Sequence, residues 1–418
     1  MFQTEDAVEK VVLIAVSSED DSRVQANLDE LALLVDTSGA VEAGRLTQKR
    51  DGVHPQHYMG SGKIEELRDL ISLVGADAIV SDDELSNSQQ RTMSNLLNVK
   101  ILDRSMVILD IFAGRASTAE GKTQVELAQL KYRLTHLSGI GTQMSRLGGG
   151  IGTRGPGEKK LETDRRYIRE RITQLNRELA EISEQRTLLR ANRRESGIIS
   201  VSMVGYTNAG KSTLMNAITE AGVFAEDKLF ATLDTTTRKT PLPDGGDILL
   251  TDTVGFIQKL PHNLIQAFKA TLEELKDADM LLHIVDASNP ERESQMKVVY
   301  ETLEELGCVD KPIITVYNKA DLDVQLPLPH DKKAFAAVNV SAKSGLNINE
   351  LLLKIAEAIK LFRKKMDVLI PYAKGGLVQM IHDRSEILSE EYREEGTLIS
   401  AYLDSEMENR LKEYAIKV

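Results

Sequence analysis

Cysteine and tryptophan are almost missing from this chain of 418 residues. The one cysteine, Cys308, cannot form a disulfide within the chain, which is typical of a reducing cytosol. Its leucine-rich surroundings favour a small core residue over a nucleophile. Tryptophan is absent and aromatic residues make up only 4% of the chain. We therefore do not expect a stacking platform for single-stranded nucleic acid.

Long hydrophobic runs are missing as well. No apolar run approaches the ~20 residues of a membrane-spanning helix. Glu5, Asp6 and Glu9 precede the first apolar run, so we do not expect a signal peptide. The formal net charge is −12, so any contact with nucleic acid requires a local basic patch. The composition is that of a globular protein of about three domains. We expect a cytoplasmic monomer.

A glycine-rich loop lies near the middle of the chain. Gly205 to Ser212 fits the pattern G-x-x-x-x-G-K-[ST], between a β-branched run and a helical pattern. This order of strand, loop and helix is typical of a phosphate-binding loop, because backbone N–H groups and the helix N-terminus face the anion. We expect Lys211, the candidate catalytic residue, to reach the β- and γ-phosphates and Ser212 to bind Mg²⁺.

Three further motifs follow at the ends of predicted strands. Asp252-Thr253-Val254-Gly255 offers a carboxylate for a Mg²⁺ water and a glycine N–H for the γ-phosphate. In Asn318-Lys319-Ala320-Asp321 the last carboxylate can accept two hydrogen bonds from guanine, whereas adenine lacks that pair of donors. Ser341-Ala342-Lys343 can present backbone N–H groups to the guanine O6. The four motifs together predict a site for GTP and GDP.

The motifs place this nucleotide domain at residues 197–363. We expect it to form a doubly wound, mostly parallel sheet with helices between the strands. The predicted strands are 198–204, 247–252, 280–286, 312–317 and 337–341.

A threonine between the first two motifs should close over Mg²⁺ and the γ-phosphate, as GTPases require. Spacing alone does not choose among four candidates, which are Thr232, Thr235, Thr236 and Thr237.

The first 115 residues alternate short strands with helical patterns, which predicts an α/β domain with a parallel sheet. We expect strands at Val11–Val16, at Ala78–Val80 and at Val99–Leu102. Gly60-Ser61-Gly62-Lys63 resembles a second phosphate loop, but His57 and Ile64 stand where the pattern requires glycine and Ser/Thr. A structural turn that opens a helix is the favoured interpretation, and an anion site is the alternative.

Residues 116–196 form a different kind of segment. Two helical stretches with coiled-coil spacing predict an antiparallel hairpin, and its apolar positions are Leu127, Leu130, Leu134, Leu137, Ile168, Ile172, Leu175, Leu179, Ile182 and Leu189. The connecting tip, 145–160, is rich in glycine. Eight basic and four acidic residues between Arg146 and Arg171 give this stretch a net charge of +4. We favour a probe for phosphates over a flexible linker.

Residues 364–418 predict a small α+β domain without a catalytic motif. Strands are expected near Val368–Pro371, Ile387–Ser389 and Thr397–Tyr402, with two helical patterns between and after them. His382 and Asp383 are expected to be surface residues.

The chain resembles the HflX family of translation-associated GTPases over nearly its full length. The matching segments are Gly205 to Ser212, Phe230 to Asp234, Asp252 to Phe256, Asn318 to Asp321, Tyr58 to Lys63, and the glycine-rich tip Gly148 to Lys160.

This resemblance implies binding to the large ribosomal subunit and a role in splitting or rescuing stalled ribosomes. It selects Thr232 as the second Mg²⁺ ligand, with Thr236 in reserve. The implied GTP-binding residues are Gly205, Tyr206, Thr207, Asn208, Ala209, Gly210, Lys211, Ser212, Thr213, Phe230, Ala231, Thr232, Leu233, Asp234, Asp252, Thr253, Val254, Gly255, Asn318, Lys319, Asp321, Ser341, Ala342 and Lys343. The residues expected to contact rRNA are Arg146, Gly148, Gly149, Gly150, Arg154, Lys159 and Lys160.

Phe256 stands where many GTPases place a glutamine that orients the attacking water, and a phenyl ring cannot do this. We therefore expect slow hydrolysis unless a bound partner or a reordered loop between Phe224 and Arg238 supplies the missing group. One alternative function is a GTPase switch for RNA modification or a membrane process. Another is a nucleotide-gated binding module that does not hydrolyse GTP.

Overall fold

The computed structural model describes residues 8–137, 156–195, 198–219, 229–243, 246–259, 274–322, 327–362, 364–403 and 405–416. The chain forms two compact units. One comprises residues 1–181 with the short pieces 227–233 and 259–269, and the other comprises 182–226, 234–258 and 270–418. The two units are described separately below.

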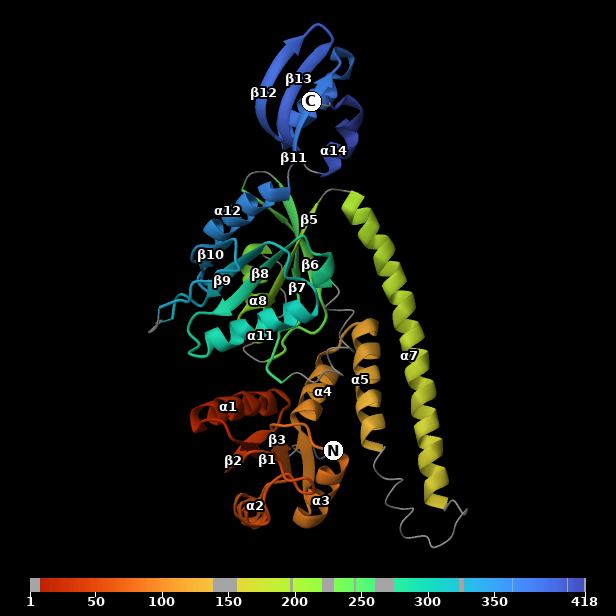
Figure 1. Ribbon diagram of the computed structural model, residues 1–418, viewed down its shortest axis with the longest axis vertical. Coiled ribbons are helices and arrows are strands. Elements are labelled where there is room, and N and C mark those ends of the chain that lie inside the picture. The colour runs from red at the N-terminus through yellow and green to blue at the C-terminus, as the bar shows by residue number, and fades with distance from the viewer. Residues whose placement is uncertain are drawn as a thin grey trace, which may run out of the picture. The chain divides into compact units, whose positions relative to one another are not determined.

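The N-terminal unit is built on a four-stranded sheet in the order β2-β1-β3-β4, with all neighbouring strands parallel. In Figure 1, α2 and α3 cover one face of this sheet and α1 and α4 cover the other. The elements are β1 (Lys10–Ser17), α1 (Asp21–Thr37), β2 (Val41–Lys49), α2 (Ser61–Val74), β3 (Ala78–Ser81), α3 (Asn87–Leu97), β4 (Lys100–Asp103) and α4 (Arg104–Arg115).

The core of this sheet explains why it forms. Strand β1 is buried along almost its whole length, as expected for a central parallel strand covered on both faces. Local signals fix the helix ends: Ser86 and Gln89 form a capping box at the start of α3, and Gly75 ends α2 with a left-handed residue. The parallel α/β domain predicted from the sequence is confirmed.

Gly60-Ser61-Gly62-Lys63 opens helix α2, as the structural interpretation predicts. Gly60 is the N-cap residue, and its N–H donates to the Gln48 side chain at 2.8 Å. Lys63 pairs with Glu66 in the next turn. The lysine ammonium is therefore already engaged within its own helix.

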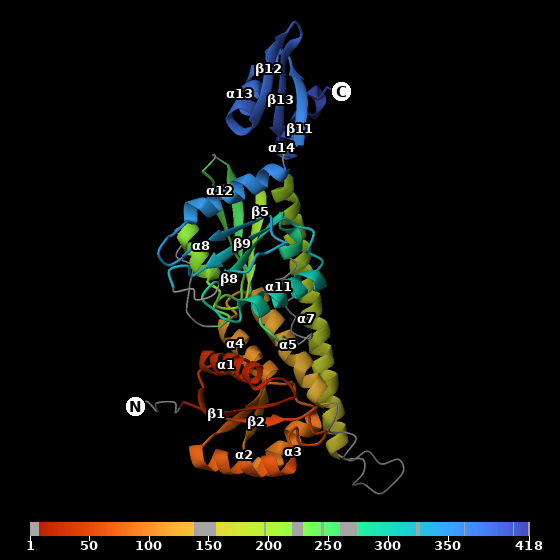
Figure 2. The same ribbon diagram turned by 60° about the vertical axis from the view of Figure 1, so that its left-hand side comes forward.

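Helices α5 (Ala119–Leu137) and α7 (Pro156–Glu195) run side by side in opposite directions (Figures 1 and 2). Leu127, Ile168 and Leu175 are buried, as the coiled-coil spacing predicts. Arg171 and Glu126 join the two helices through two parallel hydrogen bonds of 2.7 and 2.9 Å. This bidentate pairing also fixes the register of the hairpin.

The expected extent of the tip, 145–160, is wrong at its C-terminal end. Helix α7 begins at Pro156, so residues 156–160 form its first turn rather than loop. Proline is favoured at the first helical position because it has no N–H to leave unpaired there. The positions of Arg146, Gly148, Gly149, Gly150 and Arg154 lie outside the described residues.

The second unit contains a six-stranded sheet in the order β10-β9-β8-β5-β7-β6. All pairs are parallel except that of β6 with β7. Helices α8 and α12 pack on one face and α11 on the other (Figures 1 and 2). The elements are β5 (Ile199–Gly205), α8 (Lys211–Thr219), β6 (Thr236–Pro241), β7 (Asp247–Asp252), β8 (Met280–Asp286), α11 (Arg292–Glu305), β9 (Ile313–Asn318), β10 (Ala336–Asn339) and α12 (Ile348–Ile359).

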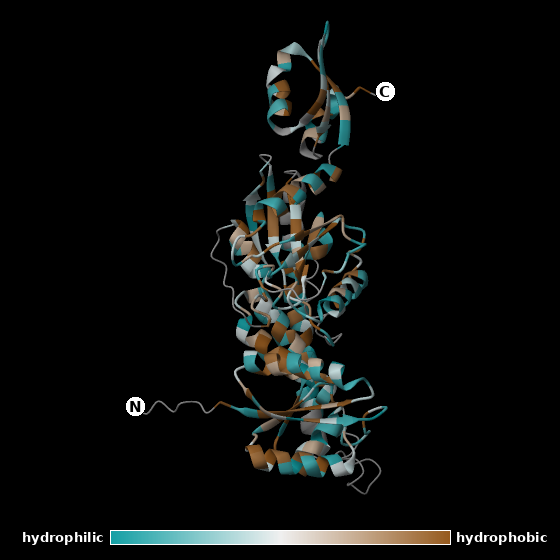
Figure 3. Cartoon of the chain, turned by 90° about the vertical axis from the view of Figure 1, so that its left-hand side faces the viewer, coloured by the Kyte–Doolittle hydropathy of each residue, from teal (hydrophilic) through white to brown (hydrophobic). Residues whose placement is uncertain are grey.

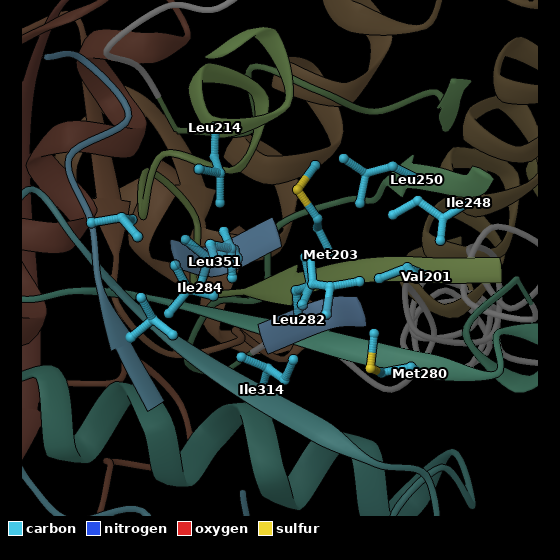
Figure 4. Packing of buried hydrophobic residues seen from close by; sticks show 14 of the residues in the cluster. Val201, Met203, Leu214, Ile248, Leu250, Met280, Leu282, Ile284, Ile314 and Leu351 are labelled. Carbon is cyan, nitrogen blue, oxygen red and sulfur yellow. The ribbon is translucent and has the colours of Figure 1, made fainter. Parts of the chain in front are cut away.

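The side chains between the sheet and one helical layer form a continuous apolar core. Val201 and Met203 of β5 point toward Leu282 of β8 and Leu250 of β7 in Figure 4, and all four are fully buried. Figure 3 shows hydrophobic residues along the central strands of this sheet. This core fixes the positions of the strand ends. The loops with the predicted motifs begin at these ends. The doubly wound, mostly parallel sheet predicted from the sequence is confirmed.

Strands β2 and β6 were not predicted. Residues 41–49 are mixed in polarity and only partly buried, as befits the edge of a sheet. Residues 236–241 lie in the threonine-rich stretch expected to be loop, and they add an antiparallel edge strand instead. Both strands lack the long apolar runs of the central strands.

The chain ends in a three-stranded antiparallel sheet of order β11-β13-β12 that packs on two helices. Ile370, Ile399 and Met407 lie in its core. The α+β module predicted for this region is confirmed. Its elements are β11 (Lys364–Ile370), α13 (Gly375–Arg384), β12 (Glu386–Arg393), β13 (Gly396–Leu403) and α14 (Ser405–Leu411).

Candidate GTP-binding and hydrolysis site

The phosphate-binding loop joins the central strand β5 to helix α8. Strand β5 has β7 on one side and β8 on the other, so the order of the strands reverses direction at β5. The loop that follows β5 therefore lies at the topological switch point, where open α/β sheets bind ligands. The helix begins at Lys211, and the N–H of Leu214 donates to the Gly210 carbonyl at 2.9 Å. The N-terminus of α8 is thus part of the loop.

Lys211 lies under this loop with its side chain buried. Its ammonium donates to the carbonyls of Gly205 at 3.1 Å and Tyr206 at 2.9 Å. Burial lowers the pKa of Lys211 to about 8, and the nearby charge of Asp252 opposes this shift. An anion such as a phosphate would stabilise the charged ammonium further and fits this environment.

Ser212 and Asp252 form the part of the site suited to Mg²⁺. The Ser212 hydroxyl donates to Asp252 Oδ2 at 2.7 Å, and both residues are buried. A hydroxyl and a carboxylate are hard oxygen ligands of the kind Mg²⁺ takes together with substrate phosphates. In the described part of the chain no cluster of three or more His, Cys, Asp or Glu could hold a metal by itself. The phosphates would have to complete the coordination.

The segment after Asp252 lies directly against the phosphate loop. The N–H of Phe256 donates to the Gly205 carbonyl at 3.1 Å, and the N–H of Thr207 donates to the Phe256 carbonyl at 2.7 Å. Gly255 packs so closely that a Cβ on it would lie 2.7 Å from the Thr207 Cα. Only glycine fits here.

Phe256 itself is buried, and its backbone is hydrogen-bonded to the loop. The side chain that follows Gly255 therefore has no polar group to offer a water. We therefore still expect slow hydrolysis in the isolated protein, because the Phe256 side chain cannot orient the attacking water.

Asn318 ties the base-recognition motif to the phosphate loop. Its Nδ2 donates to the Ala209 carbonyl at 2.9 Å, and its Oδ1 accepts from the Ala342 N–H at 3.0 Å. The amide can approach because residue 210 is glycine: a Cβ there would lie 2.2 Å from Asn318 Nδ2. One buried side chain thus joins three of the predicted motifs.

Asp321 is exposed, as a residue that contacts the edge of a bound base must be before binding. A hydrogen bond from Ser341 lowers the pKa of Asp321, with smaller contributions from Lys343 and Lys319. The carboxylate therefore stays ionised at neutral pH and can accept the two guanine donors. Lys319 is held in place by Asp286 at 2.8 Å, a partner that sequence reasoning missed.

The structure gathers most of the predicted nucleotide-binding residues in one unit. Residues 205–213, 234, 252–255, 318–321 and 341–343 all belong to it. Residues 230–233, including the favoured Mg²⁺ ligand Thr232, belong to the N-terminal unit. The reserve candidate Thr236 starts β6 and pairs with Asp252 across the antiparallel ladder. The choice between the two threonines stays a prediction.

Comparison with known proteins agrees with this site. Three family models match the chain in sequence: the N-terminal region of a GTP-binding GTPase at residues 25–113, its middle region at 115–193, and a 50S ribosome-binding GTPase at 200–319. GTPase HflX of Lacrimispora saccharolytica is 50% identical over 407 residues, which cover 97% of this chain and 96% of that protein.

The chain belongs to the HflX family of GTPases.

Relatives in distant bacteria match over the same length. GTPase HflX of Caldanaerobacter subterraneus is 46% identical over 98% of this chain and 94% of its own, and that of Escherichia coli is 39% identical over 95% and 94%. The protein is therefore a GTP-hydrolysing enzyme of a ribosome-associated family. This decides against the alternative of a binding module that does not hydrolyse GTP.

The role of Asp321 predicts a change of base preference. In Asp321→Asn the amide presents one donor and one acceptor, which suits xanthine, whose C2 carries an oxygen, better than guanine. We expect GDP to bind at least about tenfold more weakly and xanthosine diphosphate to bind more tightly than GDP. Fluorescence titration with both nucleotides measures this. Asp310→Asn, an exposed change in the same unit, is the control. An unaltered preference for GDP in Asp321→Asn would contradict the assignment of Asp321 as the residue that recognises guanine.

The pKa of Lys211 predicts how GDP binding depends on pH. A bound phosphate raises this pKa above its free value of about 8, so binding takes up a proton when the pH exceeds 8. The Kd should rise about tenfold between pH 7 and pH 9, and calorimetry in two buffers of different ionisation enthalpy should detect the proton uptake. Lys211→Arg, whose guanidinium stays charged, should lose this dependence. A Kd that is constant across the range in the wild type contradicts the argument.

Proposed function

We propose that this HflX-family GTPase hydrolyses GTP on the large ribosomal subunit and acts in the splitting or rescue of stalled ribosomes. In this proposal the tip of the α5–α7 hairpin contacts rRNA. The protein works in the cytoplasm as a monomer. The observation that carries the proposal is the combination of a candidate GTP site, in which Asn318 joins the phosphate loop to the base-recognition motif, with a long hairpin. The two helices of this hairpin are joined by Arg171 and Glu126, and its tip sequence is basic.

The hairpin supports a probing role because it is built as a rigid arm. The buried leucines and the Arg171–Glu126 pair resist sliding of one helix along the other. Lys159 and Lys160 lie in the first turn of α7, next to the glycine-rich stretch that carries Arg146 and Arg154. Arg146 precedes the glycines, Arg154 lies among them, and Lys159 and Lys160 follow them. Basic residues around a glycine-rich stretch suit the binding of phosphates by electrostatics rather than base readout.

The GTP site supports a partner-dependent reaction. Lys211 and the loop amides would hold the phosphates, while Ser212, Asp252 and a threonine, for which we propose Thr232, would hold Mg²⁺ directly or through water. The ion would neutralise charge that develops on the phosphates. Because Phe256 cannot orient the attacking water, we propose that the ribosome supplies that group or orders the protein to supply it.

A GTPase serving RNA modification or a membrane process is the alternative. None of the helices in the described ranges is long and apolar enough to cross a bilayer. The 50S ribosome-binding description of the matching family model favours the ribosome as the partner.

GTP turnover with purified ribosomal subunits tests the proposal. We expect large subunits to raise kcat at least about tenfold and small subunits to have no effect. In Arg146→Gln/Arg154→Gln the affinity for GDP should stay unchanged, because these residues do not belong to the GTP site. The stimulation should fall, and the slope of log K against log salt for ribosome binding should decrease by about 1.5.

The matched control is Arg23→Gln/Lys297→Gln, which removes two exposed basic residues elsewhere. It should behave as the wild type. Equal turnover with and without large subunits would contradict the proposal as a whole. Full stimulation of the tip variant would contradict only the role of the tip.

A further inference from the structure

The lysine of the base-recognition motif has two carboxylates near its ammonium. Asp321 lies two positions further along the chain, and its pKa is lowered chiefly by the hydrogen bond from Ser341, with a smaller contribution from the charge of Lys319. The ammonium forms its ion pair with the other carboxylate, since Lys319 Nζ lies 2.8 Å from Asp286 Oδ2. The choice of partner decides how many acceptors on Asp321 stay open to a base.

Asp286 is oriented toward this lysine by the turn that follows strand β8. Its Oδ1 accepts the Ser288 N–H at 3.0 Å and the Ser288 hydroxyl at 2.6 Å, which leaves Oδ2 for Lys319. The Asp286 side chain is only 13% exposed, whereas Asp321 is exposed. Water therefore screens the attraction of Asp286 for a cation less than that of Asp321.

A buried arginine fixes the turn in place. Arg292 is 4% exposed and donates to the carbonyls of Ala287 at 3.2 Å and Asn289 at 3.3 Å. The Ala287 N–H in turn donates to the Asn318 carbonyl at 2.9 Å, between the ends of the parallel strands β8 and β9. The carboxylate that precedes this turn is thus fixed relative to the base-recognition motif.

The backbone of Lys319 is itself held by tertiary contacts. Its φ is 62°, in the left-handed region that residues with a Cβ rarely adopt. Such strain persists only where surrounding contacts hold it. These contacts are the ion pair with Asp286 and the hydrogen bond of 3.0 Å from the Ala320 N–H to the Val340 carbonyl. The direction of the lysine side chain therefore follows from the fold and not from local preference.

Guanine recognition requires both oxygens of Asp321, one for the N1–H and one for the 2-amino group. A carboxylate has about four lone-pair positions, so the hydrogen bond from Ser341 leaves room for both donors. An ammonium bound to Asp321 would occupy one of its oxygens and neutralise the charge that strengthens the two bonds. Guanine would then have to displace a cation before it could bind fully.

We propose that Asp286 is a positioning residue for guanine recognition, which holds Lys319 away from Asp321 and so keeps both oxygens of Asp321 open to the base. It acts through Lys319 rather than on the nucleotide. Its loss reduces the preference for guanine over hypoxanthine, which lacks the 2-amino group, and leaves phosphate binding unchanged. The proposal rests on the role assigned to Asp321 and not on ribosome binding.

The affinities of the full-length protein for GDP and inosine diphosphate, measured by calorimetry, test this role. We expect the wild type to prefer GDP at least about tenfold, because inosine diphosphate offers Asp321 one donor instead of two. In Asp286→Asn the amide oxygen keeps the bonds from Ser288, so the amide NH₂ group faces Lys319 and repels it. The preference for GDP should fall at least about threefold.

Removing the charge of the lysine should abolish this effect. Lys319→Met keeps the length of the side chain but cannot compete for Asp321. Asp286→Asn should therefore leave the preference unchanged when it is introduced into Lys319→Met. Pyrophosphate, which has no base, should bind equally to the wild type and to Asp286→Asn. A merely structural role of Asp286 would not depend on the lysine.

Asp247→Asn is the matched control. Asp247 also pairs with a lysine, Lys239 at 2.7 Å, and it lies at the opposite end of β7 from Asp252. Its substitution should leave the preference for GDP unchanged. Thermal melting shows whether Asp286→Asn folds. If it does not, Ser288→Ala, which removes one of the bonds that orient Asp286, should lower the preference in the same direction.

Two results would overturn the proposal. One is an unchanged preference for GDP in the folded variant, and the other is an equal fall in preference with and without the lysine charge. A wild type that binds GDP and inosine diphosphate equally would contradict the role of Asp321 itself, and this proposal with it.

Discussion

The candidate GTP site depends on two hydrogen bonds made by the side-chain amide of Asn318. The amide donates to the phosphate loop at Ala209 and accepts from the backbone of Ala342, so the groups for phosphate and base share one fixed frame. Gly210 makes this approach possible. Asp321 and Ser341 lie close in sequence to Asn318 and Ala342, so these two hydrogen bonds position them relative to the phosphate loop that carries Lys211. The residues predicted to select guanine and those predicted to bind phosphate are thus parts of one structure rather than separate sites.

A second constraint acts on the segments that flank the site. Their described ends, Phe230 and Lys259, are held in the N-terminal unit by an aromatic contact and an ion pair. Each end adopts a left-handed backbone conformation that its own residue type disfavours. Both contacts join residues more than 100 positions apart in the sequence.

Much of this architecture could be predicted from the sequence. The central strands were found because their apolar runs end at motifs with fixed chemistry, and the hairpin because its leucines recur at coiled-coil spacing. Strands β2 and β6 were missed because edge strands carry mixed residues. The bond from Asn318 to Ala209 spans 109 positions and the pair Lys259–Asp82 spans 177. Such contacts follow from tertiary packing, which local patterns do not encode.

The most direct test of this account is calorimetry on Asn318→Ala with GDP and, separately, with inorganic pyrophosphate. Loss of the amide leaves the Ala209 carbonyl and the Ala342 N–H without their partner, at a cost of about 1–3 kcal/mol for each buried group. If Asn318 joins the two halves of the site, pyrophosphate binding should weaken by at least about tenfold, although pyrophosphate cannot reach the residues that recognise the base. If pyrophosphate bound as tightly as it does to the wild type and only GDP binding were impaired, the result would contradict the claim that Asn318 positions both the phosphate loop and the base-recognition residues.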